Sequence, residues 1–248
     1  MGKWPHCAMD ISNTLVFGAS GGIGSALVRE LSERYPTYNV YAVSRNANPL
    51  GAFAENVHSI TADFGSRNDL EGLSRNFSNS KYQINGIIVA SGVLTAITST
   101  PEKSANALNE AEMLANYRIN SIIPALIFKY FHRMISGAQS PFFAVLSARI
   151  GSISDNRLGG WYSYRMAKSA LNMFVKTAAI EFSRINRAGV VLGLHPGTVN
   201  TAFTERYIKN RSTFSPETAA ENLVSVLSAV GPSHTGQCLA YDGSVIKP

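Results

Sequence analysis

Short apolar, β-branched runs alternate with longer amphipathic segments along almost the whole chain. The runs predict seven strands, at Asn13–Phe17, Asn39–Val43, Val57–Ile60, Ile84–Ala90, Pro141–Ser147, Gly189–His195 and Gln237–Tyr241. The longer segments predict helices at Gly22–Tyr35, Arg67–Phe77, Asn109–Ile135, Tyr162–Arg187 and Pro216–Val230. Strand runs that are apolar throughout are buried on both faces. The alternation therefore predicts an α/β fold, a doubly wound (Rossmann), mostly parallel seven-stranded sheet with helices on both faces.

Nothing in the composition divides the chain or ties it to a membrane. No repeat or linker-like tract interrupts the 248 residues, so we expect one domain over residues 1–248, with 1–12 as a flexible extension. The apolar runs are far shorter than a membrane span, and residues 1–12 lack the apolar core of a secretory signal. Cys7 and Cys238 match neither a disulfide framework nor a zinc site, which favours a reducing, cytoplasmic setting.

The positive charge of the chain does not indicate nucleic acid. The net charge is +6, but Lys and Arg are scattered and no three basic residues follow one another. A solvated surface explains this distribution better than a nucleic-acid or lipid footprint, so we expect neither partner.

A glycine-rich segment, residues 18–24, joins the first predicted strand to the first helix. Glycines allow a tight turn and a close approach of the backbone to a pyrophosphate, and the helix N-terminus attracts anions. In this position the segment favours a phosphate site over a simple connection. The same residues also fit G-x-S-x-G, the elbow of a serine hydrolase, with Ser20 as nucleophile and His195 or His234 as base. That alternative is disfavoured because the elbow follows the first strand and no oxyanion-hole motif of the HGGG type is present.

The second predicted strand is followed by Ser44 and Arg45 rather than by an acidic residue. An acidic residue there accepts from the ribose 2′-hydroxyl of NAD, whereas an arginine suits the 2′-phosphate of NADP. A charge-assisted hydrogen bond of this kind contributes about 1.5–3 kcal/mol. Unless Arg45 merely faces solvent, the sequence predicts NADP(H) in preference to NAD(H).

Tyr164 and Lys168 stand four residues apart at the start of a predicted helix and share one of its faces. A nearby lysine and a cationic nicotinamide ring favour the phenolate, so we expect the pKa of Tyr164 to be lowered. The tyrosine can then act as the acid in a reduction and as the base in an oxidation. A surface Tyr–Lys pair is the plainer interpretation of this spacing, but the glycine segment upstream favours catalysis.

Together these features resemble the short-chain dehydrogenase/reductase family over essentially the whole chain. The segment 147–170 is most similar to the C-factor-like and sniffer-like carbonyl reductases. The resemblance implies Tyr164, Lys168 and Asn120 as catalytic residues, Asp63 as the contact to the adenine, and the stretch 195–201 as the wall beside the nicotinamide. The implied cofactor contacts are Gly18, Ser20, Gly22, Ile23, Gly24, Ser44, Arg45, Asp63, Ala90, Ser91, Gly92, Tyr164, Lys168, Pro196, Gly197, Val199 and Thr201.

The chain departs from the family pattern at the catalytic serine. The serine that usually opens an S-x-x-G segment is replaced by Ala148, while Ser147 precedes the alanine and Ser152 follows the glycine. Either hydroxyl is a candidate to polarise the carbonyl oxygen, and its place at the end of a strand favours Ser147. If neither serves, catalysis depends on Tyr164 alone. The segment 89–92 also lacks the asparagines that the family carries after its fourth strand.

Pro124 stands four residues after Asn120 and has no N–H to donate to its carbonyl. In the family, a freed carbonyl at this position holds a water that leads toward the lysine. A simple packing kink explains the proline equally well.

The expected function is the reduction of an aldehyde or ketone to an alcohol, with Tyr164 as proton donor. An apolar lid over the nicotinamide is expected from the loop Thr198–Ser215, with Phe203, Tyr207 and Phe214, together with Trp161 and Leu94. The alternative is an NADP-binding signalling or scaffold protein with weak turnover, which Ala148 favours. The resemblance further implies a homodimer or homotetramer formed through helices 109–135 and 162–187.

Overall fold

The computed structural model describes residues 9–46, 54–79, 83–202, 204–207 and 212–248. Within these residues one eight-stranded sheet runs in the order β3-β2-β1-β4-β5-β6-β7-β8. The strands are β1 (Thr14–Phe17), β2 (Val40–Ser44), β3 (Val57–Thr61), β4 (Gly86–Val89), β5 (Phe142–Leu146), β6 (Val190–His195), β7 (Cys238–Ala240) and β8 (Val245–Ile246). The doubly wound fold is confirmed. The expected count of seven strands is wrong by one, because β8 adds two residues antiparallel to β7.

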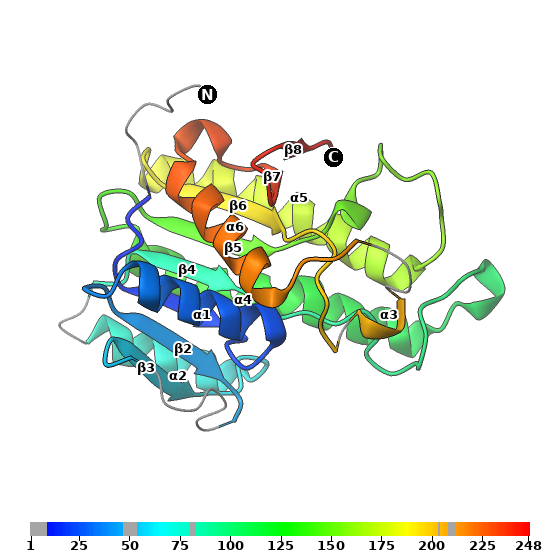
Figure 1. The fold of residues 1–248 in the computed structure, drawn as a ribbon, viewed down its shortest axis with the longest axis horizontal. Helices are drawn as coiled ribbons and strands as arrows, with labels where there is room; N and C mark the ends of the chain where they lie inside the picture. The colour runs from blue at the N-terminus through cyan, green and yellow to red at the C-terminus, as the bar shows by residue number, and fades with distance from the viewer. Residues whose placement is uncertain (1–8, 47–53, 80–82, 203, 208–211) are drawn as a thin grey trace.

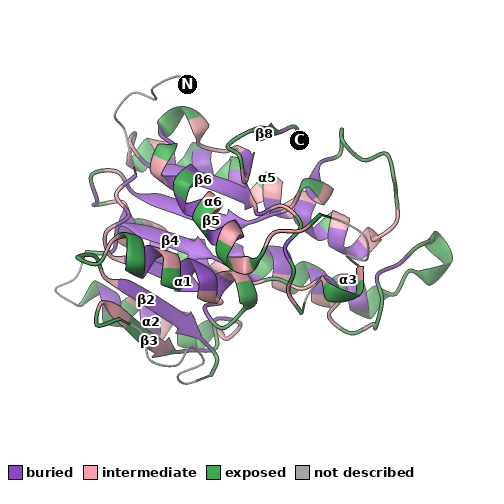
Figure 2. Ribbon diagram, viewed as in Figure 1, coloured by how far each residue is buried: buried purple, intermediate pink, exposed green. Residues whose placement is uncertain are grey.

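Helices cover both faces of the sheet (Figure 1). On one face, α1 (Gly22–Arg34) and α6 (Pro216–Ala229) pack together against the strands. On the other face, α2 (Arg67–Ser78), α4 (Ile123–Ile135) and α5 (Tyr162–Ile185) form the second core with the opposite side of the same strands. The central strands are buried along their length, as Figure 2 shows, whereas the edge strand β3 is largely open to solvent. The expectation of strands buried on both faces is thus confirmed for the centre of the sheet.

The single helix expected over Asn109–Ile135 is instead built from three pieces. It begins as α3 (Glu110–Tyr117), widens into a π-helical turn, η2 (Arg118–Ile122), and continues as α4. In the wide turn the N–H of Ile123 donates to the carbonyl of Arg118, five residues back. Pro124 comes next and has no N–H for the α-helical pattern, so the helix changes its hydrogen bonding where the proline demands it.

The remaining short elements are 3-10 turns in the connections: η1 (Ala105–Ala107), η3 (Arg149–Gly151), η4 (Glu205–Tyr207) and η5 (Pro232–His234). Of the expected N-terminal extension, residues 1–8 lie outside the described residues, whereas Met9 and Ile11 are buried against the core of α1 and α6. No helix among the described residues has the length and apolarity to span a bilayer.

The strand order places the functional loops together. The chain reverses direction along the sheet between β1 and β4, which pair in parallel in its centre. In sheets of this kind ligands bind at the carboxyl ends of the strands beside such a reversal. The loops after β1, β4, β5 and β6 all emerge at that edge.

Candidate active site

A cavity of about 440 Å³ opens at the carboxyl ends of the central strands. It brings together many residues that the sequence singles out from separate segments. Those in its wall are Gly22, Ile23, Ala90, Ser91, Gly92, Ser147, Tyr164, Lys168, Pro196, Gly197, Val199 and Thr201. Gly18, Ser20, Gly24, Asn120, Ser44, Arg45 and Asp63 lie outside the lining.

The glycine segment forms the turn that the sequence indicates. Gly18 has φ +84°, and a Cβ there would lie 2.9 Å from the backbone nitrogen of Ser91. A Cβ on Gly24 would come within 2.1 Å of the carbonyl oxygen of Gly18, and one on Gly22 within 2.8 Å of Cγ2 of Thr201. No side chain caps the N-terminus of α1, where Gly21 stands as the N-cap. The first N–H groups of α1 therefore face the cavity edge without a side-chain acceptor, a suitable cradle for a phosphate.

The ends of β2 and β3 lie side by side, since Ser44 and Thr61 are paired across the two strands. Arg45 is exposed just beyond β2, and Asp63 is exposed just beyond β3. Ser44 is buried, and its hydroxyl donates to the carbonyl of Asn46 at 2.8 Å. The pairing brings Arg45 and Asp63 to the edge of the sheet that also holds the glycine turn, where the N–H of Gly18 donates to the carbonyl of Val43 in β2.

Tyr164 and Lys168 occupy the first turns of α5 and both are buried in the cavity wall. The Nζ of Lys168 lies 5.7 Å from the centre of the Tyr164 ring and donates to the carbonyl of Leu146 at 2.8 Å. Burial lowers the pKa of Lys168 to about 8, against a smaller opposing effect of Cys238. The helix thus presents a phenol and an amine to the same space.

The expected lowering of the Tyr164 pKa is not found, because burial raises the pKa of this phenol. The same burial weakens the positive charge of Lys168, whose amine is engaged with Leu146. The protein side chains by themselves therefore keep Tyr164 protonated at neutral pH, the state that a proton donor needs.

A buried carboxylate from a distant segment holds the start of α5. Glu102 is 4% exposed and accepts from the backbone N–H of Ser163 at 3.3 Å and from the Ser163 hydroxyl. The backbone carbonyl of Glu102 accepts from the N–H of Trp161. Trp161 is the N-cap of α5 and lies in the left-handed region, with φ 53°. A negative charge at a helix N-terminus is favourable, so Glu102 fixes the turn that carries Tyr164.

Three buried polar residues follow one another at four-residue intervals: Glu112, Asn116 and Asn120, which are 1%, 0% and 0% exposed. The Nδ2 of Asn120 donates to Oδ1 of Asn116 at 2.7 Å, and the Nδ2 of Asn116 donates to Oε1 of Glu112 at 3.3 Å. Oδ1 of Asn120 accepts from the N–H of Val93 at 3.2 Å, and Nδ2 also donates to the Val93 carbonyl at 2.9 Å. We call this chain of contacts the polar ladder. It fixes the orientation of the Asn120 amide beside the loop that follows β4.

Glu112 also anchors that loop. Its carboxylate accepts from the N–H groups of Ala96, Ile97 and Thr98 at 2.8, 2.7 and 2.8 Å. Burial raises the pKa of Glu112, but the backbone donors together lower it by more than burial raises it. The pKa of this carboxyl therefore lies below its usual range. The loop carries Leu94 in the cavity wall, so the polar ladder connects the wall to Asn120.

The two candidate serines have different surroundings. Ser147 lies in the cavity wall and is 4% exposed, and its hydroxyl donates to Oδ1 of Asn172 at 2.6 Å. Ser152 is not in the wall, and its hydroxyl accepts from the N–H of Asp155 at 3.1 Å. Ala148 is in the wall beside Ser147. Of the two hydroxyls, only that of Ser147 belongs to a residue of the cavity.

Some of the aromatic residues that were expected to form a lid line the cavity, and others do not. Trp161 and Tyr207 are in the cavity wall, with ring centres 5.6 Å apart in an edge-to-face contact. Phe214 packs against Tyr241 instead, at 4.7 Å, and Phe203 lies outside the described residues. Part of the cavity wall is therefore aromatic, and Leu94 and Ile150 add to its apolar surface.

The hydrolase alternative receives no support from this arrangement. Ser20 is exposed and outside the cavity wall, whereas His195 is within that wall. Within the described residues, no cluster of His, Cys, Asp and Glu is arranged to hold a metal ion.

Sequence reasoning missed Glu102, Glu112, Asn116 and Asn172. The four-residue spacing from Glu112 to Asn120 was a usable signal, because it places three polar groups on one face of an otherwise apolar helix. Nothing local marked Glu102 or Asn172, whose partners come from other segments.

Known proteins resemble this chain over nearly its full length. A family model described as short chain dehydrogenase matches residues 12–212. The 1-hydroxy-2-glutathionyl-2-methyl-3-butene dehydrogenase of Rhodococcus is 27% identical, over 96% of this chain and 100% of that protein. Carbonyl reductase Sniffer of Drosophila melanogaster has a similar fold, with a TM-score of 0.82 at 22% identity over 96% of this chain and 100% of that one. The NADPH-bound carbonyl reductase from chicken fatty liver has a TM-score of 0.83 at 22% identity, over 100% of this chain and 99% of that one.

Proposed function

Because the chain belongs to the short-chain dehydrogenase/reductase family of oxidoreductases, we propose that it reduces an aldehyde or ketone to an alcohol with NADP(H) as cofactor. Tyr164 donates the proton in this reaction. The observation that carries the proposal is the burial of Tyr164 and Lys168 together in the wall of a cavity that begins at the glycine turn.

The residues around the cavity fit a dinucleotide. The glycine turn leaves no room for Cβ atoms at Gly18, Gly22 and Gly24, and the N-terminus of α1 has no side-chain cap. Arg45 supplies a cation at the end of β2, where the 2′-phosphate of NADP would lie, and this position supports NADP(H) over NAD(H). When bound, the cofactor supplies the hydride that reaches the carbonyl carbon.

The chain's own residues supply the proton and the positioning. Tyr164 is protonated at neutral pH because burial raises its pKa, so its hydroxyl can donate to the carbonyl oxygen as negative charge develops there. Lys168 lies against the ring of Tyr164 and would hold the nicotinamide ribose when the cofactor is bound. Asn120, oriented by the polar ladder, links Lys168 to solvent through water at its carbonyl.

Ser147 is proposed to steady the carbonyl oxygen, in place of the serine that Ala148 replaces. It is the candidate hydroxyl whose residue lies in the cavity wall. Its hydroxyl now donates to Asn172, so it must turn from that acceptor to reach a substrate. This cost predicts modest catalysis compared with a site that has the usual serine.

The test is the variant Tyr164→Phe. Loss of the proton donor should lower turnover of a panel of aldehydes and ketones by about 100-fold or more, while NADPH binding changes little. Turnover is followed by the loss of NADPH absorbance, and binding by energy transfer from tryptophan. Tyr162→Phe, on the same helix but outside the cavity wall, is the matched control. Equal losses in the two variants would contradict the assigned role of Tyr164.

The alternative is an NADP-binding signalling or scaffold protein of the same fold, and Ala148 is the observation that favours it. This alternative predicts NADPH binding by the wild-type protein without absorbance loss for any carbonyl compound of the panel. The same pair of measurements therefore separates the two functions.

We also propose that the protein forms a homodimer or homotetramer through α3 and α5. Apolar side chains gather on these helices with large exposed fractions: Leu114 63%, Met166 54% and Met173 68%. Soluble monomers rarely expose large contiguous apolar patches. Sedimentation analysis of Met166→Glu against wild type tests this, and an unchanged mass would contradict it.

A further inference from the structure

The wall of the cavity carries charge of one sign. Among its described residues the charged side chains are Lys168 and Arg149, and no carboxylate lines it. Lys168 is buried and donates to Leu146, but Arg149 has a side chain that is 55% exposed. Arg149 begins η3 directly after Ala148, so it stands beside the position where the family has its serine.

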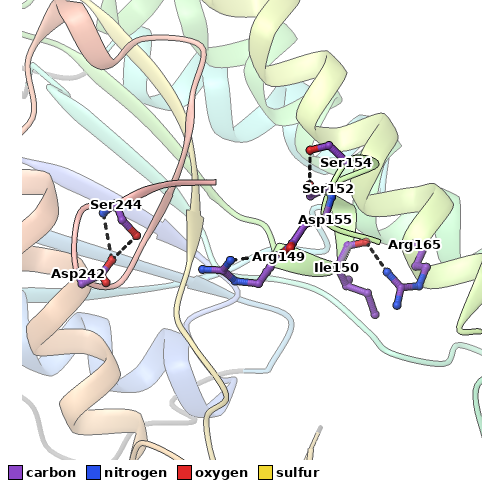
Figure 3. A network of polar contacts seen from close by, with 8 residues as sticks. All are labelled: Arg149, Ile150, Ser152, Ser154, Asp155, Arg165, Asp242 and Ser244. Atoms are coloured by element: carbon purple, nitrogen blue, oxygen red, sulfur yellow. Dashed lines mark hydrogen bonds and ion pairs between the residues drawn. The ribbon is translucent and has the colours of Figure 1, made fainter. Parts of the chain in front are cut away.

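The guanidinium of Arg149 makes one side-chain contact among the described residues, which leaves most of its N–H groups available as donors. Its Nη1 contacts Oδ2 of Asp155 at 3.3 Å, in a pair whose carboxylate side chain is itself 48% exposed (Figure 3). Ion pairs with such exposure are weak. Asp242 lies across from Arg149 in the same view, but no ion pair joins these two side chains among the described residues, and Oδ1 of Asp242 accepts from the N–H and hydroxyl of Ser244 at 3.0 and 2.6 Å. The remaining N–H groups of Arg149 are therefore able to bind a ligand.

A neutral imidazole completes this side of the cavity. His195 ends β6, which pairs directly with β5, the strand before Arg149. Its Nδ1 is buried and has no hydrogen-bond partner among the described residues. Burial, and next the charge of Arg149, lower the pKa of His195 to about 4, with a smaller opposing effect of Asp242. At pH 7 the ring is neutral and offers one N–H and one acceptor nitrogen.

This cation is separate from the phosphate cradle. The cradle follows β1, whereas Arg149 follows β5, two strands away in the sheet. With strands about 4.8 Å apart, that separation is about 10 Å. Arg149 therefore belongs to the part of the cavity wall that follows β5, and Trp161 and Tyr207 line the same cavity.

We propose that Arg149 and His195 form an anion subsite, and that the substrate is an aromatic or other apolar carbonyl compound carrying a carboxylate. Arg149 binds the carboxylate, His195 adds a neutral hydrogen bond, and the apolar wall holds the rest of the molecule. This inference rests on the proposed reductase function and specifies its substrate class.

A matched pair of substrates tests it: phenylglyoxylate, which is an anion, and its neutral methyl ester. The readout is the ratio of kcat/KM for the acid over kcat/KM for the ester. Arg149→Gln should lower this ratio about 10- to 100-fold, since a hydrogen bond to a charged group contributes about 1.5–3 kcal/mol. Arg149→Lys should lower it less, because the charge is kept, and His195→Phe should lower it in the same direction. Arg157→Gln, an exposed arginine of the same loop outside the cavity wall, should keep the wild-type ratio.

A binding measurement separates this subsite from the reductase function. Protein loaded with NADP⁺ is titrated with phenylglyoxylate and with the ester by calorimetry. Binding of the acid that weakens about 10- to 100-fold in Arg149→Gln but not in Arg157→Gln supports the subsite, even if neither compound is reduced and the reductase proposal fails. Reduction of both compounds with an unchanged ratio in Arg149→Gln overturns the subsite and leaves the reductase function standing. Equal binding of the acid by wild type and Arg149→Gln also overturns it.

Discussion

Glu112→Ala provides a quantitative test of the polar ladder. The substitution removes the acceptor of three backbone N–H groups, at 2.7–2.8 Å, and of the amide of Asn116. A buried donor left without an acceptor costs about 1–3 kcal/mol. The loop is partly open and Ile97 is 63% exposed, so water replaces some of these bonds and the low end of the range applies to each. The three backbone N–H groups alone therefore predict a loss of about 3 kcal/mol in the free energy of unfolding.

Urea denaturation of the cofactor-free protein measures this loss, as the change in midpoint at constant slope. The control is Glu110→Ala, an exposed acidic residue in the first turn of the same helix, which should change stability by less than about 1 kcal/mol. A loss below about 1 kcal/mol for Glu112→Ala would refute the view that its carboxylate holds the loop.

The same carboxylate gives a pH dependence of known sign. The backbone donors outweigh burial and lower the pKa of Glu112 in the folded protein, relative to about 4.3 when unfolded. Its contribution is then fully present above the unfolded pKa and is lost as the pH falls through the folded value. The stability difference between wild type and Glu112→Gln should shrink below about pH 4. A difference that stays constant from pH 7 to pH 3 would contradict this.

Two further predictions follow from the site. Gly24→Ala should lower the free energy of unfolding by about 1–3 kcal/mol and weaken NADPH binding, because its Cβ would lie 2.1 Å from the carbonyl oxygen of Gly18. Gly21→Ala should have a mild effect, because the nearest contact of its Cβ is at 3.4 Å. Denaturation and NADPH titration of both variants check this, and equal effects would count against the glycine turn. Burial lowers the pKa of Lys168 to about 8 in the folded protein, against about 10.4 when unfolded. Between these two pH values the unfolded state binds more protons than the folded state. The stability of the wild type relative to Lys168→Met should therefore rise with pH over this range, by up to about 3 kcal/mol. Denaturation at pH 7, 8.5 and 10 measures it, and a fall with pH would reverse the inferred sign.

Much of the fold could be predicted from the sequence because its signals are local. The strand and helix periods, the glycine segment and the Tyr164–Lys168 spacing each concern neighbouring residues, and the rules for parallel sheets then bring the loops together. Strand β8 escaped prediction because two residues have no period, and the break at η2 escaped because its apolar pattern continues through it.

The supporting contacts could not be predicted, because they join segments far apart in the chain. Glu102 caps a helix sixty-one residues away, at Ser163, and Asn172 accepts from Ser147, twenty-five residues earlier. The pKa of Tyr164 could not be inferred either. Sequence shows the neighbouring lysine but not the burial that raises the pKa of the phenol and lowers that of the amine.

The wide turn η2 restricts the number of residues in this segment as well as their chemistry. It lets a single face carry the polar ladder up to Asn120 and then the apolar stripe of Ile123, Ile127 and Phe131. One residue of an α-helix corresponds to a rotation of about 100°. Inserting a further residue between 118 and 122 would therefore swing either the ladder or the stripe toward water, whereas removing one residue would close the five-residue turn to an α-helical one and keep both in place. The segment can accept exchanged side chains at exposed Arg118, and its wide turn leaves room for one residue fewer but not for one more.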